Sequence, residues 1–214
     1  MAVYNDALRD YIVTTFVPAD PVMESIIRDS AAAGLPPISI RADEGQFLQL
    51  LVRACGARNA LEIGTLGGYS GSWIARGLPP GGRLTTLELE AKHADVARQH
   101  FNRAGVGERV TVKVGNAHDL LPGLSEHGLY DFVFIDAEKT GYGKYFEWAV
   151  ANTRPGALII AHNAFHDGKV VQGDKADPST QAVHAFNCQV ARDPRVHASI
   201  FPGGDGMTVA VRRA

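Results

Sequence analysis

Apolar and polar residues follow two different periods along this chain. Up to about residue 56, apolar residues recur every three to four positions, which is the spacing of amphipathic helices. Residues that favour helix ends support this pattern: Asn5 and Asp20 are candidate caps, Pro21 is a candidate first helical residue, and Gly34 is a candidate stop. Three helices are therefore expected, at residues 5–16, 19–34 and 43–54.

After this helical region, short apolar strands alternate with amphipathic helices. Continuous apolar runs such as DFVFI and ALIIA are typical of strands that are buried on both faces of a parallel sheet. Five such strands are expected, at residues 59–64, 83–90, 109–115, 130–137 and 157–163. The helices expected between and after them lie at residues 69–78, 92–105, 117–124, 144–153 and 179–193.

The chain ends in two β-rich segments, residues 196–202 and 206–213, with no helix between them. Two such neighbours predict an antiparallel hairpin at one edge of the sheet. The predicted fold class is therefore α/β, with a doubly wound, mostly parallel, seven-stranded sheet and an N-terminal helical extension.

Length and composition restrict the class of protein. The 214 residues fit a single domain, with helices over residues 1–56 and an α/β core over residues 57–214. A net charge of −2 argues against non-specific binding to nucleic acid or to anionic membranes, and no apolar run approaches the roughly 20 residues that span a bilayer. Two cysteines cannot form a disulfide framework. We therefore expect a cytoplasmic protein with no membrane or nucleic-acid partner.

A glycine-rich turn, LEIGTLGGYSG, follows the first strand of the core. Glycines let the backbone turn tightly and approach a ligand, but their spacing here differs from the G-x-G-x-x-G of nicotinamide enzymes. Glu62 beside this turn suits a cationic cofactor, which favours S-adenosylmethionine. Glu88 lies near the end of the second strand, where an acid either binds ribose hydroxyls or is simply solvated.

Polar residues also end the fourth and fifth strands. Asp136 ends the fourth strand and Lys139 follows it, while His162 and Asn163 end the fifth. Because neighbouring parallel strands end at the same edge of a sheet, these side chains are expected in one crevice. A carboxylate, an imidazole and an amide oxygen can bind a cation, and a lysine can remove a proton from a hydroxyl.

Six segments carry a resemblance to the cation-dependent O-methyltransferases of the catechol and caffeoyl-CoA type. They are ADEGQFLQLLVRACGARNALEIGTLGGYS, LTTLELE, GNAHDLLP, YDFVFIDAEKTGYGKY, HNAFHDGKV and GDGMTVAV, in order from about residue 38 to the end. The resemblance implies a Rossmann-like class I methyltransferase fold, S-adenosylmethionine as methyl donor, a phenolic acceptor and a homodimer.

The resemblance also implies roles for individual residues. S-adenosylmethionine would contact Ile40, Glu62, Gly64, Thr65, Ser70, Glu88, Ala117 and Asp136. A divalent metal, Mg²⁺ or Mn²⁺, would be bound by Asp136, His162 and Asn163. Lys139 would be the catalytic base beside the acceptor, and His166 either lines the acceptor pocket or is an exposed loop residue. In this mechanism the metal lowers the pKa of a catechol hydroxyl, and the phenolate attacks the sulfonium methyl group in line.

His162 is the main departure from the family pattern, which has an aspartate at this position; His166, Glu138 and Gly141 also differ from the residues that are common there. Imidazole in place of a carboxylate removes a negative charge and suits transition metals better than Mg²⁺. Three roles stay open for His162: ligand of another transition metal, base in an enzyme with a weak or absent metal, or structural loop residue.

The leading hypothesis is a metal-assisted O-methyltransferase that acts on a small catechol-like or hydroxylated aromatic acceptor. One alternative is a metal-independent O-methyltransferase in which His162 or Lys139 is the base. A non-catalytic S-adenosylmethionine-binding protein is another, although Lys139 argues against it. A nicotinamide oxidoreductase is the weakest alternative, because the spacing of the glycines does not match the G-x-G-x-x-G of those enzymes.

Overall fold

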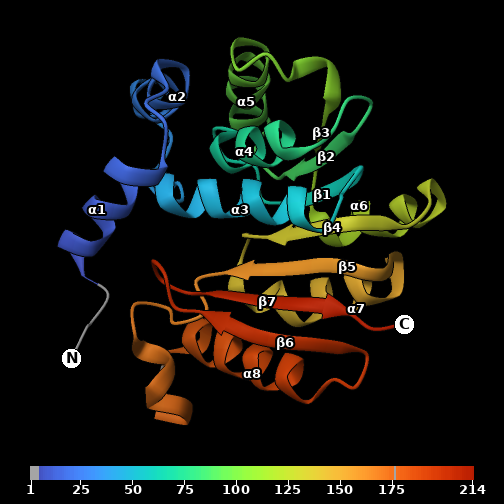
Figure 1. Ribbon diagram of the computed structural model, residues 1–214. Coiled ribbons are helices and arrows are strands. Elements are labelled where there is room, and N and C mark those ends of the chain that lie inside the picture. The colour runs from blue at the N-terminus through green and yellow to red at the C-terminus, as the bar shows by residue number, and fades with distance from the viewer. Residues whose placement is uncertain (1–4, 176) are drawn as a thin grey trace.

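The computed structural model describes residues 5–175 and 177–214. Within them, seven strands form one sheet in the order β3-β2-β1-β4-β5-β7-β6 (Figure 1). The strands are β1 (Asn59–Ile63), β2 (Arg83–Glu88), β3 (Val110–Val114), β4 (Tyr130–Ile135), β5 (Thr153–His162), β6 (Val196–Phe201) and β7 (Met207–Arg212). The pairs from β3 to β5 are parallel, and β7 is antiparallel to both β5 and β6. The predicted fold class, including the edge hairpin, is confirmed.

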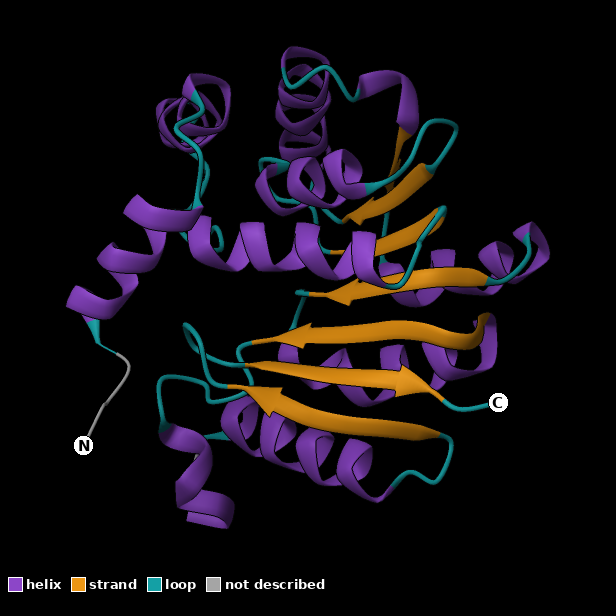
Figure 2. Cartoon of the chain, viewed as in Figure 1, coloured by secondary structure: helices purple, strands orange, loops and turns teal. Residues whose placement is uncertain are grey.

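Helices cover both faces of this sheet (Figure 2). In the view of Figure 1, α3 crosses in front of the sheet and α7 lies behind it. The α-helices are α1 (Asp6–Phe16), α2 (Pro21–Ala32), α3 (Ala42–Ala54), α4 (Tyr69–Gly77), α5 (Ala91–Arg103), α6 (Ala117–Leu124), α7 (Tyr142–Asn152) and α8 (Pro178–Arg192). Short 3₁₀ turns are η1 (Gly107–Arg109), η2 (Ser125–His127), η3 (Lys139–Gly141) and η4 (Lys169–Lys175). Among the described residues, no helix is long and apolar enough to cross a membrane.

The helix ends form as the sequence predicts. Asn5 caps α1 by accepting a hydrogen bond from the backbone N–H of Leu8 at 3.0 Å. Asp20 caps α2, and Pro21 is its first residue. Gly34, with φ of +75°, turns the chain away after α2. These caps satisfy N–H groups that the first helical turn leaves without a partner.

Two apolar cores lie on opposite faces of the sheet. One packs the sheet against α2, α3, α4 and α5, and the other packs it against α6, α7 and α8. Alternate residues of β4 point to opposite faces, so Phe132 and Phe134 belong to the first core while Val133 and Ile135 belong to the second. This explains why the strand sequences are apolar without interruption, as expected for a parallel sheet between two helical layers.

The observed β5 begins four residues earlier than expected, at Thr153 rather than Ala157. Thr153 pairs with Tyr130, and the register then shifts before Phe132 pairs with Leu158. The irregularity contains Pro155, which has no N–H to give to a ladder of hydrogen bonds. A proline usually argues against a strand interior, so the sequence pattern did not include this first part.

Candidate active site

A cavity of about 950 Å³ opens along the carboxyl ends of β1 to β5. The strand order reverses between β1 and β4, and ligands of doubly wound sheets bind at such a point. Of the predicted site residues, all but Glu62 and His162 line this cavity: Ile40, Gly64, Thr65, Ser70, Glu88, Ala117, Asp136, Lys139, Asn163 and His166. Glu62 and His162 are 0% and 7% exposed and lie behind the cavity wall.

Gly64 brings the turn after β1 against the end of β4. Its φ is +99°, and a Cβ atom added there would lie 2.2 Å from the carbonyl oxygen of Asp136. Only glycine combines this backbone conformation with so close an approach. From the sequence, this glycine was expected to let the backbone approach a ligand. The structure shows a second reason, which is the close packing of the chain after β1 against the end of β4.

Unusual backbone conformations concentrate at the cavity. Among the described residues, the non-glycine positions with positive φ are Leu66, Asn163, His166 and Asp167, with φ from 48° to 57°. All four line the cavity. Such conformations are uncommon for side-chain-bearing residues and persist where the surrounding structure imposes them, often at functional sites. Their clustering supports this cavity as the functional site.

Glu88 is buried and holds the turn after β1. One carboxylate oxygen accepts hydrogen bonds from the backbone N–H groups of Thr65 at 3.1 Å and Leu66 at 2.7 Å. The other oxygen accepts from the N–H of Glu90 at 3.0 Å. Glu88 is therefore not a solvated strand-end acid, and it shapes the glycine turn while it also faces the cavity.

Glu62 lies directly beneath that turn. Its two carboxylate oxygens accept hydrogen bonds from the hydroxyls of Ser70 at 2.6 Å and Thr86 at 2.7 Å. Burial raises the pKa of Glu62 to about 8, although the two hydroxyls act in the opposite direction. Glu62 is thus hydrogen-bonded to Ser70, which lines the cavity. With a pKa of about 8, its carboxyl group is largely protonated at neutral pH.

Lys139 connects the ends of β4 and β5. Its ammonium nitrogen donates to Asp136 Oδ1 at 3.1 Å, to Asn163 Oδ1 at 2.7 Å and to the Tyr142 hydroxyl at 2.6 Å. That hydroxyl in turn donates to the carbonyl oxygen of His162 at 3.2 Å. The sequence predicted that three of these side chains meet. The ring of Tyr142 is fully buried, and its hydroxyl also orients Lys139.

The imidazole of His162 lies between two carboxylates. Its Nε2 is 2.9 Å from Glu44 Oε1, and its Nδ1 is 3.3 Å from Asp136 Oδ2. Burial alone would lower the pKa of His162, but hydrogen bonds and charge from Asp136 and Glu44 outweigh burial and raise it to about 10. Burial alone would raise the pKa of Asp136, but His162 and Lys139 together lower it to about 2. Both groups are therefore charged at neutral pH.

Glu44 is a site residue that sequence reasoning did not single out. It is 3% exposed, and its second carboxylate oxygen accepts a hydrogen bond from the backbone N–H of Arg41 at 2.8 Å, at the start of α3. It lies 118 positions from His162 in the chain, so no local spacing predicts their contact. The available signal was the ADEGQ segment, which belongs to the resemblance but reads locally as an ordinary helix start.

A divalent ion needs ligand atoms whose lone pairs are free and face one point. The Asp136 and Asn163 oxygens face the Lys139 ammonium, and both His162 nitrogens face carboxylates. A ring nitrogen that carries a proton has no lone pair for a metal. In the part of the chain that the structure describes, no group of three or more His, Cys, Asp or Glu side chains is arranged to hold an ion. As arranged here, Asp136, His162 and Asn163 do not fit a divalent metal.

His166 lines the cavity, which favours the pocket role over that of an exposed loop histidine. Its Nδ1 lies 2.6 Å from the Thr180 hydroxyl, which itself donates to Asp177 at 2.7 Å. Because that hydroxyl proton is engaged, the His166 ring donates from Nδ1. The ring is thereby fixed at the start of α8, on the side of the cavity formed by β5 and the segment after it.

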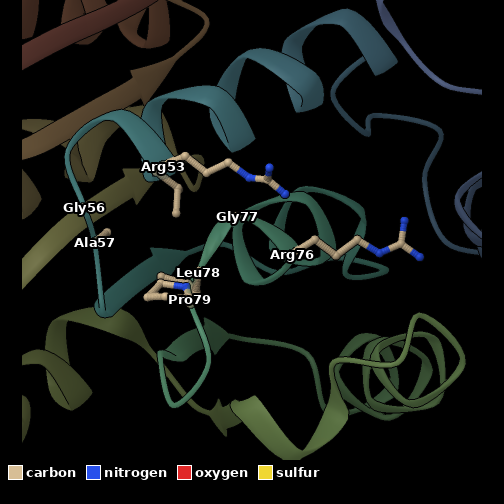
Figure 3. Close-up of a pocket in the computed structure, with 8 residues that line it drawn as sticks. Arg53, Gly56, Ala57, Arg76, Gly77, Leu78 and Pro79 are labelled. Carbon is tan, nitrogen blue, oxygen red and sulfur yellow. The ribbon is translucent and has the colours of Figure 1, made fainter.

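A second, smaller hollow of about 360 Å³ lies where α3 and α4 end (Figure 3). It is lined by Val52, Arg53, Gly56, Ala57, Arg76, Gly77, Leu78 and Pro79. In Figure 3 the Arg76 side chain points away from the loop of Gly56 and Ala57, and its guanidinium pairs with Asp20. Neither a carboxylate nor a histidine lines this hollow, so the acid–base groups belong to the larger cavity.

Comparison with known proteins identifies the family of the chain. A family profile described as O-methyltransferase matches residues 14–213. A catechol O-methyltransferase from Niastella koreensis is 41% identical over 96% of each chain, and one from Mycobacterium tuberculosis is 46% identical over 78% of this chain and 76% of its own. The crystal structure of an O-methyltransferase from Bacillus cereus in complex with SAH is 42% identical, covers 97% of each chain and superposes with a TM-score of 0.92.

The doubly wound sheet, with its cavity at the switch point, defines the class of protein as a Rossmann-like methyltransferase. The chain belongs to the O-methyltransferase family, which confirms the resemblance to the catechol and caffeoyl-CoA type. It is an enzyme that uses S-adenosylmethionine to methylate oxygen.

Proposed function

We propose that this enzyme transfers the methyl group of S-adenosylmethionine to a hydroxyl of a small catechol-like or hydroxylated aromatic acceptor, with Lys139 as the base. The observation that carries the proposal is the position of Lys139. Its nitrogen lies at the cavity wall, bonded to the ends of both β4 and β5, next to the turn predicted to hold the cofactor. The names of the relatives support a catechol-like acceptor.

The chemistry follows from these positions. Lys139 is an ammonium ion in the free enzyme and first gives one proton to solvent. The neutral amine then takes the hydroxyl proton of the acceptor, and the resulting phenolate oxygen attacks the methyl carbon. The carbon–sulfur bond breaks, and its electron pair stays on sulfur, which gives S-adenosylhomocysteine. Because a phenol normally has a pKa of about 10, a base and nearby positive charge must act together at neutral pH. Ordering of donor and acceptor in one cavity supplies much of the remaining rate.

We propose the metal-independent form of this reaction. The sequence favoured a metal-assisted one, but the three predicted ligands face cations or carboxylates of the protein itself. Without an ion to chelate two neighbouring oxygens, the enzyme does not require a vicinal diol. We therefore expect single phenolic hydroxyls of similar size to be methylated as well.

A methyl-transfer assay tests the proposed function. The enzyme is incubated with S-adenosylmethionine carrying a labelled methyl group and with catechol, guaiacol, resorcinol and phenol in turn, and products are identified by mass spectrometry. We expect labelled methyl ethers from at least one of these acceptors. Tight binding of the cofactor by calorimetry, with no transfer to any phenol, would instead favour the non-catalytic binding protein.

Cofactor binding is expected to release a proton from Glu62. S-adenosylmethionine carries a sulfonium and an ammonium group, and a nearby positive charge favours the ionised carboxylate. Because the pKa of Glu62 is about 8 without the cofactor, binding should release up to about one proton at neutral pH, and affinity should rise with pH until Glu62 is ionised.

Calorimetry in buffers with different ionisation enthalpies measures this proton release. Glu62→Gln should abolish the buffer dependence. S-adenosylhomocysteine, which lacks the sulfonium, should release less than the full cofactor does. The same proton release from the Gln variant would assign the titration to another group.

A homodimer and a cytoplasmic location remain proposals. On α1, which has no buried residue, the apolar side chains of Leu8, Tyr11 and Phe16 are exposed. An exposed apolar face of this kind supports association through the N-terminal helices. Light scattering coupled to size exclusion measures the oligomeric state, and a monomer at working concentrations would rule the homodimer out.

A further inference from the structure

His162 is enclosed by groups that require a positive charge on it. A neutral imidazole has one N–H donor and one acceptor nitrogen, whereas an ionised carboxylate only accepts. Both ring nitrogens of His162 face carboxylate oxygens, one from Glu44 and one from Asp136. Each of these carboxylates is ion-paired with a further basic side chain, Glu44 with Arg41 and Asp136 with Lys139. Nε2 therefore donates to Glu44, and Nδ1 lies at ion-pair distance from Asp136, an arrangement that requires a proton on both nitrogens and makes the ring an imidazolium.

The surroundings hold this arrangement rigidly. Glu44 is fixed from one side by the backbone of Arg41 at the start of α3. From the other side, the loop before β7 closes over it, because a Cβ atom added at Gly204 would lie 1.9 Å from Glu44 Oε1. The His162 ring also packs near Phe134, with ring centroids 6.4 Å apart. The imidazolium is thus a fixed charge, and water has little access to it.

Asp136 consequently has a cation on each of its two oxygens. Lys139 lies 3.1 Å from Oδ1, and His162 lies 3.3 Å from Oδ2. A divalent ion bound to Asp136 would have to displace one of these cations or lie against both. Like charges held close together in a poorly solvated site repel strongly. The arrangement therefore disfavours metal binding through electrostatics as well as through the lack of free donors.

We propose that the Glu44–His162 pair takes the place of a divalent ion in this enzyme: His162 is an internal cation that orients and neutralises Asp136, so that methyl transfer proceeds without a metal. This proposal rests on the proposed function, since it explains how the same site carries out that reaction. His162 does not line the cavity, so it is a positioning residue that acts through Asp136. Asp136, held in this way, aims Lys139 at the acceptor hydroxyl.

The first experiment measures metal binding directly. Mn²⁺ is titrated into the wild-type protein saturated with S-adenosylhomocysteine, and free Mn²⁺ is followed by electron paramagnetic resonance. We expect no stoichiometric binding, and we expect the rate of methyl transfer in excess chelator to equal the rate without it. A single tight Mn²⁺ site, together with loss of activity in chelator, would overturn the proposal.

The second experiment replaces the internal cation by a ligand. His162→Asp removes the imidazolium and places a third oxygen donor beside Asp136 and Asn163, which is a donor set that suits Mn²⁺ or Mg²⁺. We expect this variant to bind Mn²⁺ about tenfold or more tightly than the wild type does, which corresponds to ~1.4 kcal/mol, and to lose activity in chelator. No gain in Mn²⁺ affinity in the folded variant would contradict the claim that His162 occupies the place of the ion.

If His162→Asp does not fold, nitrogen chemical shifts of His162 in the wild type decide the question. Two protonated ring nitrogens at neutral pH support the proposal, and a neutral ring overturns it. Because Mn²⁺ binding and ring protonation are measured without an acceptor, a failure to methylate phenols would count against the proposed function alone.

Glu44→Gln tests the positioning role. We expect kcat to fall about tenfold while the KM for the cofactor stays unchanged, because the amide no longer holds the imidazolium and Asp136 loses its orientation. Asp131→Asn is the matched control. Asp131 also accepts backbone hydrogen bonds, from Arg58 and Asn59 at 2.7 Å, and pairs with Arg154, but at the opposite end of the sheet. The Asp131→Asn variant should be less stable than the wild type but keep its kcat. An equal loss of kcat in Asp131→Asn and Glu44→Gln would mean that Glu44 has only a structural role.

Discussion

Replacement of Lys139 by methionine is expected to lower kcat for methyl transfer by about 10²- to 10⁴-fold, the range attributed to one positioned base. Methionine keeps much of the length and the apolar stem of lysine but cannot accept a proton. Lys139 joins Asp136, Asn163 and Tyr142, so the variant also removes the group that links β4 to β5 at the cavity wall. The affinity for S-adenosylhomocysteine should change little, because that ligand offers no proton to this base.

Rapid-quench measurement of a single turnover gives the rate of methyl transfer, and calorimetric titration of S-adenosylhomocysteine gives the affinity of the cofactor site. Lys144→Met is the matched control, since Lys144 lies on the exposed side of α7 and should keep the full rate. Lys139→Arg should not rescue the reaction, because a guanidinium stays protonated and cannot act as a base. A methionine variant that turns over as fast as the wild type would remove Lys139 from the mechanism.

The fold was predictable because its signals are local. Cap residues such as Asn5 and Asp20 act within one helical turn, and a run such as DFVFI shows its burial on both faces within five residues. The start of β5 was missed for the same reason, since Pro155 is a local argument against a strand. Its pairing there depends on Tyr130 of β4, which no pattern within β5 reveals.

The site was predictable only where strand ends bring residues together. Asp136, Lys139 and Asn163 follow neighbouring parallel strands, so topology alone places them in one crevice. Glu44 arrives from a helix outside that alternation, and its contact with His162 depends on how α3 crosses the sheet. The sequence therefore marked His162 as unusual but could not give its partners. The positive φ angles of His166 and Asp167 likewise have no sequence signal, because neither residue type demands that conformation.

Replacement of Asp136 by asparagine is expected to affect both activity and stability. Asparagine preserves the shape of the side chain but removes the negative charge between His162 and Lys139. Two poorly solvated cations would then face each other without their shared partner, and removal of one member of a buried ion pair typically costs several kcal/mol. We expect the free energy of unfolding to fall by ~3 kcal/mol and kcat to fall by about 10³-fold, because Lys139 loses its alignment as well.

The loss of stability in Asp136→Asn is expected to depend on pH. Because the pKa of Asp136 is about 2, below that of an unfolded aspartate, its contribution to stability is present above about pH 4 and is lost as the pH falls toward 2. Urea unfolding of wild type and Asp136→Asn should therefore differ most near neutral pH, and the two curves should converge in acid.

A double-mutant cycle identifies the cause of the stability loss. Once the charge of Asp136 is gone, His162→Gln removes one of the two opposed cations, so this substitution should cost much less stability in the Asp136→Asn background than in the wild type. In the presence of Asp136, the same His162→Gln change should destabilise the protein, because it breaks the pairs with Asp136 and Glu44. Strictly additive effects of the two substitutions would mean that His162 and Asp136 do not interact through charge, which would remove the basis for His162 as an internal cation.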